Sequence, residues 1–380
     1  MSRACEQCLR RTWLMAQLAG HLDRARAHIA EVLSLDDDAL LQAVGGRRRD
    51  EVRRGWAGPE PQRLRAKGER AGLELICRCD PRYPARLRDL ASPPAVLHVA
   101  GGLERFLAGA ATEAVALVGS RAASSYGTGV ARSLARGLAS AGVPVISGMA
   151  AGIDSSAHRG ALSVGAPALP VGAPALPGDP SGPDPSALTI AVLPGPADRA
   201  YPRGASGLYR QIVRSGSAVS EMPPGTPVRS WMFLARNRTI AAMAVMTIVV
   251  EAGTGSGALL TAHCARAAGR AVGAVPGQVT TPQARGPNQL IREGAHVVSG
   301  AQDVLDLLFE AGSRSAPMDD RPALNRELTT LLAAVAEGHD TPAALIRHGA
   351  LPEQGLAALA SLELAGYVAR GPGGRFTVVP

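Results

Sequence analysis

The chain has 380 residues, and 40 Lys and Arg against 32 Asp and Glu give it a formal net charge of +8. This length exceeds one typical domain and can bury a full hydrophobic core. The positive charge suggests an acidic partner such as nucleic acid. Because aromatic residues are only 3% of the chain, we expect few side chains for base stacking.

Secretion and membrane insertion are not expected from this sequence. No apolar stretch of a secretory signal occurs near residue 1. The longest strongly apolar run, residues 240–250, is too short to cross a bilayer. Five cysteines in a chain of this size do not form a secreted disulfide framework. We therefore expect a cytoplasmic protein without a membrane span.

Residues 1–72 have the pattern of a small helical module. Leu14 and Leu18 are spaced for one helical face, and the acidic run at residues 36–38 suits the N-terminus of a further helix. The basic run at residues 47–54 is typical of a solvated face or a linker.

Four cysteines form two closely spaced pairs. Cys5 and Cys8 have the spacing of metal ligands, and Cys77 and Cys79 supply two more sulfurs about seventy residues later. Four thiolates could hold a structural zinc ion that pins the N-terminus to the main domain. Unpaired cysteines without a metal are the alternative. This alternative is favoured because only one residue separates Cys77 from Cys79, whereas two residues are more usual between zinc ligands.

Residues 114–162 have a β-α-β-α pattern. Apolar runs at 114–118 and 143–146 fit strands that are buried on both faces of a parallel sheet. Helices are expected at residues 126–141 and from residue 155 onward. This pattern predicts an α/β fold with an extended Rossmann-like parallel-sheet core spanning residues 73–312.

Glycine and serine residues follow both of these strands, together with one arginine, and these residues are candidates for a phosphate site. They are Gly119, Ser120 and Arg121 after the first strand, and Ser147 and Gly148 after the second. The glycines would let a ligand approach the backbone, a following helix N-terminus favours phosphate, and Arg121 adds a fixed cation. Tight turns without a ligand are the alternative. The dinucleotide fingerprint G-x-G-x-x-G is absent, so ordinary NAD chemistry is not expected.

An ordered set of motifs over residues 80–303 resembles the DNA-processing protein A family (DprA, also called Smf). The motifs are Val118-Gly119-Ser120-Arg121, Tyr126-Gly127, the run 147–162, the run 189–192, Tyr201-Pro202, Ser220-Glu221, Arg236-Asn237-Arg238, Glu251-Ala252, Ser256-Gly257, Thr261, Pro276-Gly277 and the run 288–291. In this family a SAM-like or helix-hairpin-helix module is found at the N-terminus, which the resemblance implies for residues 1–72.

A Pro/Gly-rich segment, residues 163–187, interrupts the family pattern. It contains the heptapeptide VGAPALP twice in tandem, and we expect an inserted surface loop without a core role. Beyond it, the layered pattern continues. Strands are expected at 189–193, 218–220, 246–250 and 271–275, and helices at 206–215, 238–243, 258–268 and 301–309.

The second half of the core adds further candidate DNA-binding residues. They are Arg203, Arg236, Asn237, Arg238, Ser256, Gly257 and Thr261. Arginine can grip phosphate with two donors or stack on bases. Because a doubly wound sheet brings distant strand ends to one edge, we expect Arg121, Arg236 and Arg238 to line a single groove. A surface ion-pair cluster and plain helix capping are the alternatives.

Several acidic residues and a histidine of the core are expected to have structural roles. Asp154, Glu221 and Glu251 would cap helices or accept hydrogen bonds, and His158 would contact its own loop. The sequence shows no Ser-His-Asp order, HExxH motif or Walker lysine, so we expect a protein that is not an enzyme.

The C-terminal part is expected to be a polar linker, residues 313–322, followed by a winged-helix-like domain at 323–380. Three helices and a hairpin are indicated there. The third helix carries Glu353, Gln354 and Glu363 but no basic residue before Arg370. Helices that read a DNA groove are usually more basic, so we favour a protein-contact or weak DNA role.

The resemblance implies a single-stranded-DNA-binding protein that needs no cofactor. It would protect incoming DNA in natural transformation, load the RecA recombinase for homologous recombination, and form a homodimer through its core. Two other classes stay open. One is a Rossmann-type nucleotide-cleaving phosphoribohydrolase, although the segment around Pro276-Gly277 lacks that family's glycine-rich motif. The other is a transcription regulator acting through the winged helix.

Overall fold

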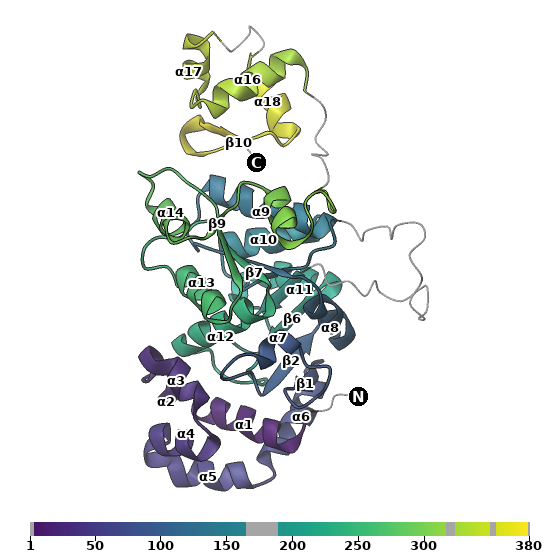
Figure 1. Cartoon of the computed structure of the whole chain (residues 1–380), viewed down its shortest axis with the longest axis vertical. Coiled ribbons are helices and arrows are strands. Elements are labelled where there is room, and N and C mark those ends of the chain that lie inside the picture. The colour runs from purple at the N-terminus through teal and green to yellow at the C-terminus, as the bar shows by residue number, and fades with distance from the viewer. Residues whose placement is uncertain (1–3, 165–188, 317–323, 350–354, 379–380) are drawn as a thin grey trace, which may run out of the picture.

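The computed structural model describes residues 4–164, 189–316, 324–349 and 355–378. A large mixed sheet with helices on both faces occupies the middle of the molecule (Figure 1). Helices of the N-terminal segment lie at one end, and the C-terminal helices and hairpin lie at the other.

The central sheet has nine strands in the order β1-β2-β6-β5-β4-β3-β7-β8-β9. The strands are β1 (Glu74–Cys77), β2 (Val96–Ala100), β3 (Val115–Val118), β4 (Val145–Ser147), β5 (Thr189–Val192), β6 (Ser217–Ser220), β7 (Met246–Val249), β8 (Ala271–Ala274) and β9 (His296–Val297). The strands from β6 to β9 pair in parallel, whereas β2 and β1 are added in antiparallel register at the β6 edge. The expected parallel-sheet core is therefore present, with two further strands, joined through antiparallel pairings, that the pattern did not predict as part of it.

Strand β3 is the point where the strand order reverses. Its neighbours are β4, which follows it in the chain, and β7, which returns from the other half of the fold. In such sheets a crevice forms outside the carboxyl ends of the strands that flank the reversal. The candidate site lies there.

Alternate residues of the strands pack into two hydrophobic layers, one on each face of the sheet. In β3, Ala116 and Val118 face one layer, and Val115 and Leu117 face the other. The first layer is covered by α7 (Ala85–Arg88), α8 (Leu103–Ala111), α12 (Ser230–Met243), α13 (Gly257–Ala267) and α14 (Arg285–Arg292). The second is covered by α9 (Ser125–Ser140), α10 (Ile153–Leu162) and α15 (Ala301–Leu308). Helix α11 (Ser206–Ser215) packs beside α10 against β5 and β6.

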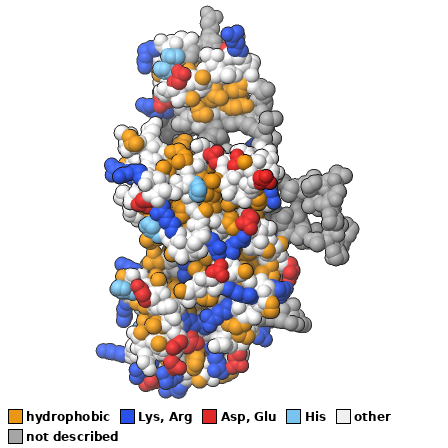
Figure 2. All heavy atoms as spheres, in the orientation of Figure 1, with side chains coloured by type: hydrophobic (Ala, Val, Ile, Leu, Met, Phe, Trp, Pro, Cys, Tyr) orange, Lys and Arg blue, Asp and Glu red, His pale blue; other side chains and the backbone are white. Residues whose placement is uncertain are grey.

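The N-terminal segment is helical, as expected. Its α-helices are α1 (Glu6–Gln17), α2 (Ala19–Leu22), α3 (Ile29–Ser34), α4 (Asp37–Val44), α5 (Arg49–Ala57) and α6 (Glu60–Arg70). Helices α1 to α5 share a hydrophobic cluster with α12 of the core. The indole of Trp231 donates a hydrogen bond to the carbonyl of Ala19 at 2.9 Å, and its backbone N–H donates to Asp23 at 3.1 Å. Many exposed Lys and Arg side chains on the face in Figure 2 lie over its lower half, where these helices adjoin the core.

The C-terminal segment has its own small core. Helices α16 (Arg326–Ala336), α17 (Pro342–Arg347) and α18 (Gly355–Leu364) precede an antiparallel pair, β10 (Val368–Arg370) and β11 (Phe376–Val378). This order agrees with the expected three helices and hairpin, and the winged-helix assignment stays a prediction.

Two expected segments lie mainly outside the described residues. They are the repeat-containing insertion, from residue 165 onward, and the linker, from residue 317 onward. Within the described parts of the chain, no helix combines the length and the apolar character needed to cross a bilayer.

The start of α12 is the main correction to the predicted elements. We expected a helix only from residue 238, but α12 begins at Ser230. The Arg236-Asn237-Arg238 motif therefore lies inside a helix and not at its start. Ten of the fourteen residues of α12 are buried, because the sheet lies on one side of it and the N-terminal helices on the other.

Candidate nucleic-acid interface

A groove of about 550 Å³ lies where the carboxyl ends of β3 and β7 meet helix α12. Eight of the expected site residues line it: Gly119, Ser120, Arg121, Arg236, Asn237, Ser256, Gly257 and Thr261. The groove is also lined by Asp154, Phe233, Gly253 and Gly255. The prediction that these distant segments meet at one sheet edge agrees with this arrangement.

Arg121 lies at the rim of the groove beside an aromatic pair. Its side chain is exposed, and its guanidinium carbon lies 5.2 Å from the centre of the Phe233 ring. Phe233 in turn meets Tyr201 edge to face, with ring centres 5.5 Å apart. A cation over an aromatic face gains electrostatic attraction while the guanidinium donors stay available to a ligand. Sequence reasoning missed Phe233, because this position was not assigned to a helix of the site.

Arg236 is buried and forms part of the groove floor. It donates from Nη1 to the carbonyl oxygens of Gly148 at 2.6 Å and Val192 at 3.0 Å. Burial lowers the pKa of Arg236, while the neighbouring carboxylate of Asp154 opposes this effect. Burial likewise raises the pKa of Asp154, and Arg236 counteracts the rise. Arg236 therefore ties together the ends of β4 and β5.

Gly119 and Gly148 are required by packing against the protein itself. A Cβ atom at Gly119 would lie 2.5 Å from the side chain of Ile153 and 2.8 Å from the carbonyl oxygen of Glu251. A Cβ atom at Gly148 would collide with the guanidinium of Arg236. The space that a side chain would take is filled by Ile153 and Glu251 at Gly119 and by Arg236 at Gly148. The expectation that the missing side chains admit a ligand is thus wrong at both positions, although Gly119 still lines the groove. Ser147 is also buried, and its hydroxyl donates to the carbonyl of Leu117 at 2.6 Å.

Glu251 fixes the turn between β3 and α9. One carboxylate oxygen accepts a hydrogen bond from the backbone N–H of Ser124 at 2.9 Å, and the other accepts from the Ser124 hydroxyl. The carbonyl of Glu251 accepts from the N–H of Ser120 at 2.6 Å. Asp154 accepts from the N–H of Ala150 at 3.3 Å. These contacts agree with the structural roles expected for both carboxylates.

The start of α13 forms the opposite wall of the groove. The Ser256 hydroxyl accepts from the N–H of Ala258 at 3.3 Å and so caps the helix, which was the alternative considered for it. Asn237 donates from its side-chain amide to the carbonyl of Gly257 at 3.2 Å. Added Cβ atoms at Gly253 and Gly255 would meet only open space. This glycine-rich wall can thus admit a ligand close to its backbone.

Two of the expected arginines lie outside the groove. Arg238 forms an ion pair with Glu221 at 2.7 Å and lines a different pocket, between the core and the N-terminal helices. Arg203 is exposed in a short 3-10 helix and is not among the lining residues. The prediction that three arginines line one groove is therefore wrong for Arg238, which faces the other side of α12.

His158 contacts a strand, not its own loop as expected. Its Nδ1 shares a hydrogen bond with the hydroxyl of Thr189 at 2.7 Å, and the ring is fully buried. Burial, reinforced by the positive charges of Arg236 and Arg159, lowers the pKa of His158 to about 3.

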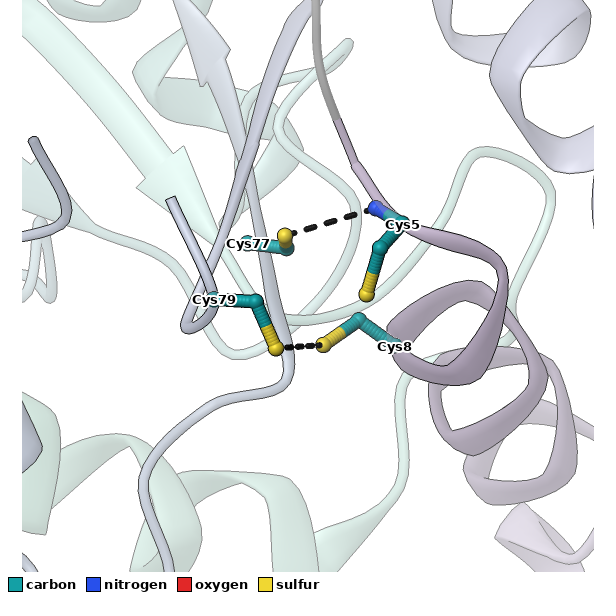
Figure 3. A group of neighbouring side chains, drawn as sticks. All are labelled: Cys5, Cys8, Cys77 and Cys79. Atoms are coloured by element: carbon teal, nitrogen blue, oxygen red, sulfur yellow. Dashed lines mark hydrogen bonds between the residues drawn. The ribbon is translucent and has the colours of Figure 1, made fainter. Parts of the chain in front are cut away.

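The four paired cysteines come together at the junction of α1 and β1. Their sulfur atoms all lie within 4.8 Å of one another, and the sulfurs of Cys8 and Cys79 are 3.7 Å apart. Figure 3 shows the four side chains gathered in one place, with Cys5 and Cys8 at the start of α1 facing Cys77 and Cys79.

Comparison with known proteins identifies the family. A family model described as DNA recombination-mediator protein A matches residues 74–309. This chain belongs to that family. It is 37% identical over 362 residues to a DNA processing protein DprA of Mycobacterium tuberculosis, covering 86% of each chain. It is also 33% identical over 302 residues to protein Smf of Escherichia coli, covering 77% of this chain and 74% of that one.

Solved structures agree with the family's fold. The X-ray structure of DNA processing protein A from Streptococcus pneumoniae covers 80% of this chain and 98% of that chain, with 27% identity and a TM-score of 0.60. A Helicobacter pylori DNA processing protein A, described for its single-stranded DNA binding mode, covers 63% and 97% with 24% identity and a TM-score of 0.51. Members of the DprA family are DNA-binding mediators and not enzymes, which confirms the expectation of a non-enzymatic protein.

Proposed function

We propose that this chain binds single-stranded DNA in the groove at the ends of β3 and β7, in the service of DNA processing during natural transformation. Membership of the DprA family supports a DNA-directed role. The H. pylori relative is described as binding single-stranded DNA, which supports the choice of strand state. The observation that carries the proposal is the exposed guanidinium of Arg121 over the ring of Phe233 at the rim of this groove.

The groove offers three kinds of contact that suit a single strand. Arg121 provides a charge and donors for a phosphate group. Phe233 provides an apolar ring on which a base could stack if Arg121 moves toward the phosphate. The wall from Gly253 to Gly257 provides backbone N–H groups near the N-terminus of α13, where the helix dipole favours an anion. Most of these contacts are made to the backbone of the strand, so the sequence preference should be weak.

Two partners belong to the same proposal. The family resemblance supports loading of the RecA recombinase onto the bound strand and a homodimer formed through the core. Protection of incoming strands follows if the bound strand is withheld from nucleases. The cytoplasm, where transforming strands meet recombinase, is the compartment this role requires.

The test is a fluorescence anisotropy titration that compares labelled single strands with duplexes over a range of salt concentrations. We expect preferential binding of single strands and a strong dependence on salt. Arg121→Ala should weaken binding roughly tenfold, the worth of about one charged hydrogen bond. It should also reduce the salt slope by about 0.7, the value for one phosphate contact to a single strand.

Arg370→Ala is the matched control, since Arg370 is also exposed but lies in the C-terminal hairpin. It should change affinity much less than Arg121→Ala. If Arg121→Ala has no effect and Arg370→Ala abolishes binding, the site is in the C-terminal module. Tight binding to one duplex sequence, retained after deletion of the core, would favour a transcription regulator.

A further inference from the structure

The cysteine cluster joins two segments that are far apart in the sequence. Cys5 and Cys8 lie at the N-terminal end of α1, Cys77 is the last residue of β1, and Cys79 lies in the turn that follows. About seventy residues separate the two pairs, and they include the remaining N-terminal helices. Cys8 and Cys77 are buried, Cys5 is half-buried and Cys79 is exposed.

The spacing of the four sulfurs fits one tetrahedral ion. A zinc ion with zinc–sulfur bonds of about 2.3 Å holds its sulfurs about 3.8 Å apart. Here the sulfurs of Cys8 and Cys79 are 3.7 Å apart, and all four lie within 4.8 Å of one another. A disulfide needs about 2.05 Å between two sulfurs, and two disulfides would divide the group into separate pairs. The cluster instead has all four side chains gathered in one place (Figure 3).

The surroundings also suit thiolate ligands. The backbone N–H of Cys5 donates to the sulfur of Cys77 at 3.4 Å, a contact that stabilises charge on a sulfur and orients it. Four sulfur ligands form a closed set without an open coordination position, which is typical of structural zinc.

We propose that Cys5, Cys8, Cys77 and Cys79 bind a structural zinc ion. This site is independent of the DNA-binding proposal, because none of its ligands lines the groove. The ion would fasten the start of α1 to β1, the outermost strand of the sheet. Around the cluster, Leu9 of α1, Leu64 of α6 and Val96 of β2 belong to one small hydrophobic cluster. The metal would thus hold the N-terminal helices to the core at one end of α1, while the contacts with α12 hold them at the other.

Metal analysis of the full chain, purified without chelator from zinc-supplemented cells, tests the site. We expect about one zinc per chain in the wild type. Cys79→Ser, which changes the most exposed ligand, should lose most of the zinc. Cys264→Ser is the matched control, because Cys264 is a half-buried cysteine of α13 that is not part of the cluster, and it should keep the metal.

A second measurement does not depend on a variant that folds. Cobalt(II) added to metal-stripped wild-type protein should produce the thiolate charge-transfer and d–d absorption bands of a tetrahedral four-sulfur site, with saturation at about one equivalent. Stripping the metal should expose four additional thiols to a thiol reagent.

Three results with the wild-type protein would overturn the proposal, as would one result with a variant. They are zinc-free wild-type protein that also fails to bind cobalt, a Cys8–Cys79 disulfide in the unreduced protein by peptide mass spectrometry, and bound iron in place of zinc. Equal zinc content in the Cys79→Ser and wild-type proteins would show that the metal is held elsewhere. If the zinc-free protein still binds single strands, the zinc proposal fails while the DNA-binding proposal stands.

Discussion

Replacing Arg236 by alanine tests whether this arginine braces the groove or contacts the ligand. Its guanidinium donates to the carbonyls of Gly148 and Val192 and lies beside the buried carboxylate of Asp154. Truncation leaves two buried carbonyl oxygens without these donors and removes the positive charge next to Asp154. We therefore expect the variant to be strongly destabilised.

The magnitude follows from the contacts that are lost. A hydrogen bond to a charged group is worth about 1.5–3 kcal/mol, and Arg236 donates two of them to buried carbonyl oxygens. Both bonds come from the same guanidinium nitrogen and are not fully additive, so about 3–5 kcal/mol is the expected loss for Arg236→Ala. At about 2–4 °C per kcal/mol for a core of this size, the melting temperature should fall by roughly 6–20 °C.

The assay is urea unfolding and thermal unfolding of Arg236→Ala, Arg236→Lys and Arg121→Ala beside the wild type. Lysine keeps the charge but not the longer guanidinium, whose Nη1 donates to both carbonyls, so Arg236→Lys should be intermediate. Arg121→Ala is the control, and as an exposed substitution it should change stability by less than about 0.5 kcal/mol. If Arg236→Ala keeps the wild-type urea midpoint and loses DNA affinity as Arg121→Ala does, Arg236 is a ligand contact and the bracing argument is wrong.

Two further predictions concern polar groups of the core, the buried His158 and the half-buried Ser256. The folded pKa of His158 is about 3 and the unfolded value is about 6.5, so its contribution to stability is complete above pH 6.5 and is lost as the pH falls toward 3. His158→Gln should reduce the slope of the unfolding free energy against pH in this window by up to about 1.4 kcal/mol per pH unit. A residual slope should remain, because burial also lowers the pKa of His98 to about 4. An unchanged slope in the variant would contradict the assignment. Ser256→Ala should cost about 1 kcal/mol through loss of the cap of α13, whereas Ser256→Gly should cost only a few tenths, as measured by urea unfolding; equal costs would show that the hydroxyl does not act as a cap.

The strands of the core were predictable because burial on both faces leaves continuous apolar runs. The expected strands at 189–193, 246–250 and 271–275 each match an observed strand to within one residue. The start of α12 was not predictable in the same way. A helix that is covered on nearly all sides has no polar face, so no amphipathic period marked residues 230–237.

The error over Arg238 follows directly from that missed helix start. In an extended segment, residues two apart point to the same side, and Arg236 and Arg238 would have faced one groove together. In a helix with 3.6 residues per turn, residues two apart point about 200° from each other. Arg236 therefore reaches the ends of β4 and β5, while Arg238 pairs with Glu221 beside the N-terminal helices. Which arginine is exposed depends on tertiary packing, which spacing alone does not encode.

The motif residues around the groove share one physical task, which is to hold loops from distant parts of the chain in fixed positions. Arg236 connects the ends of β4 and β5, Asn237 holds the first turn of α13, and Glu251 holds the turn from β3 into α9. Each brace uses a buried or half-buried polar group whose partner is a backbone atom, so the geometry of the groove is set by the protein itself. Charged and amide side chains next to glycines thus indicate a ligand site indirectly. They fix the shape of the groove, and the exposed Arg121 and the Phe233 ring are left to make the contacts.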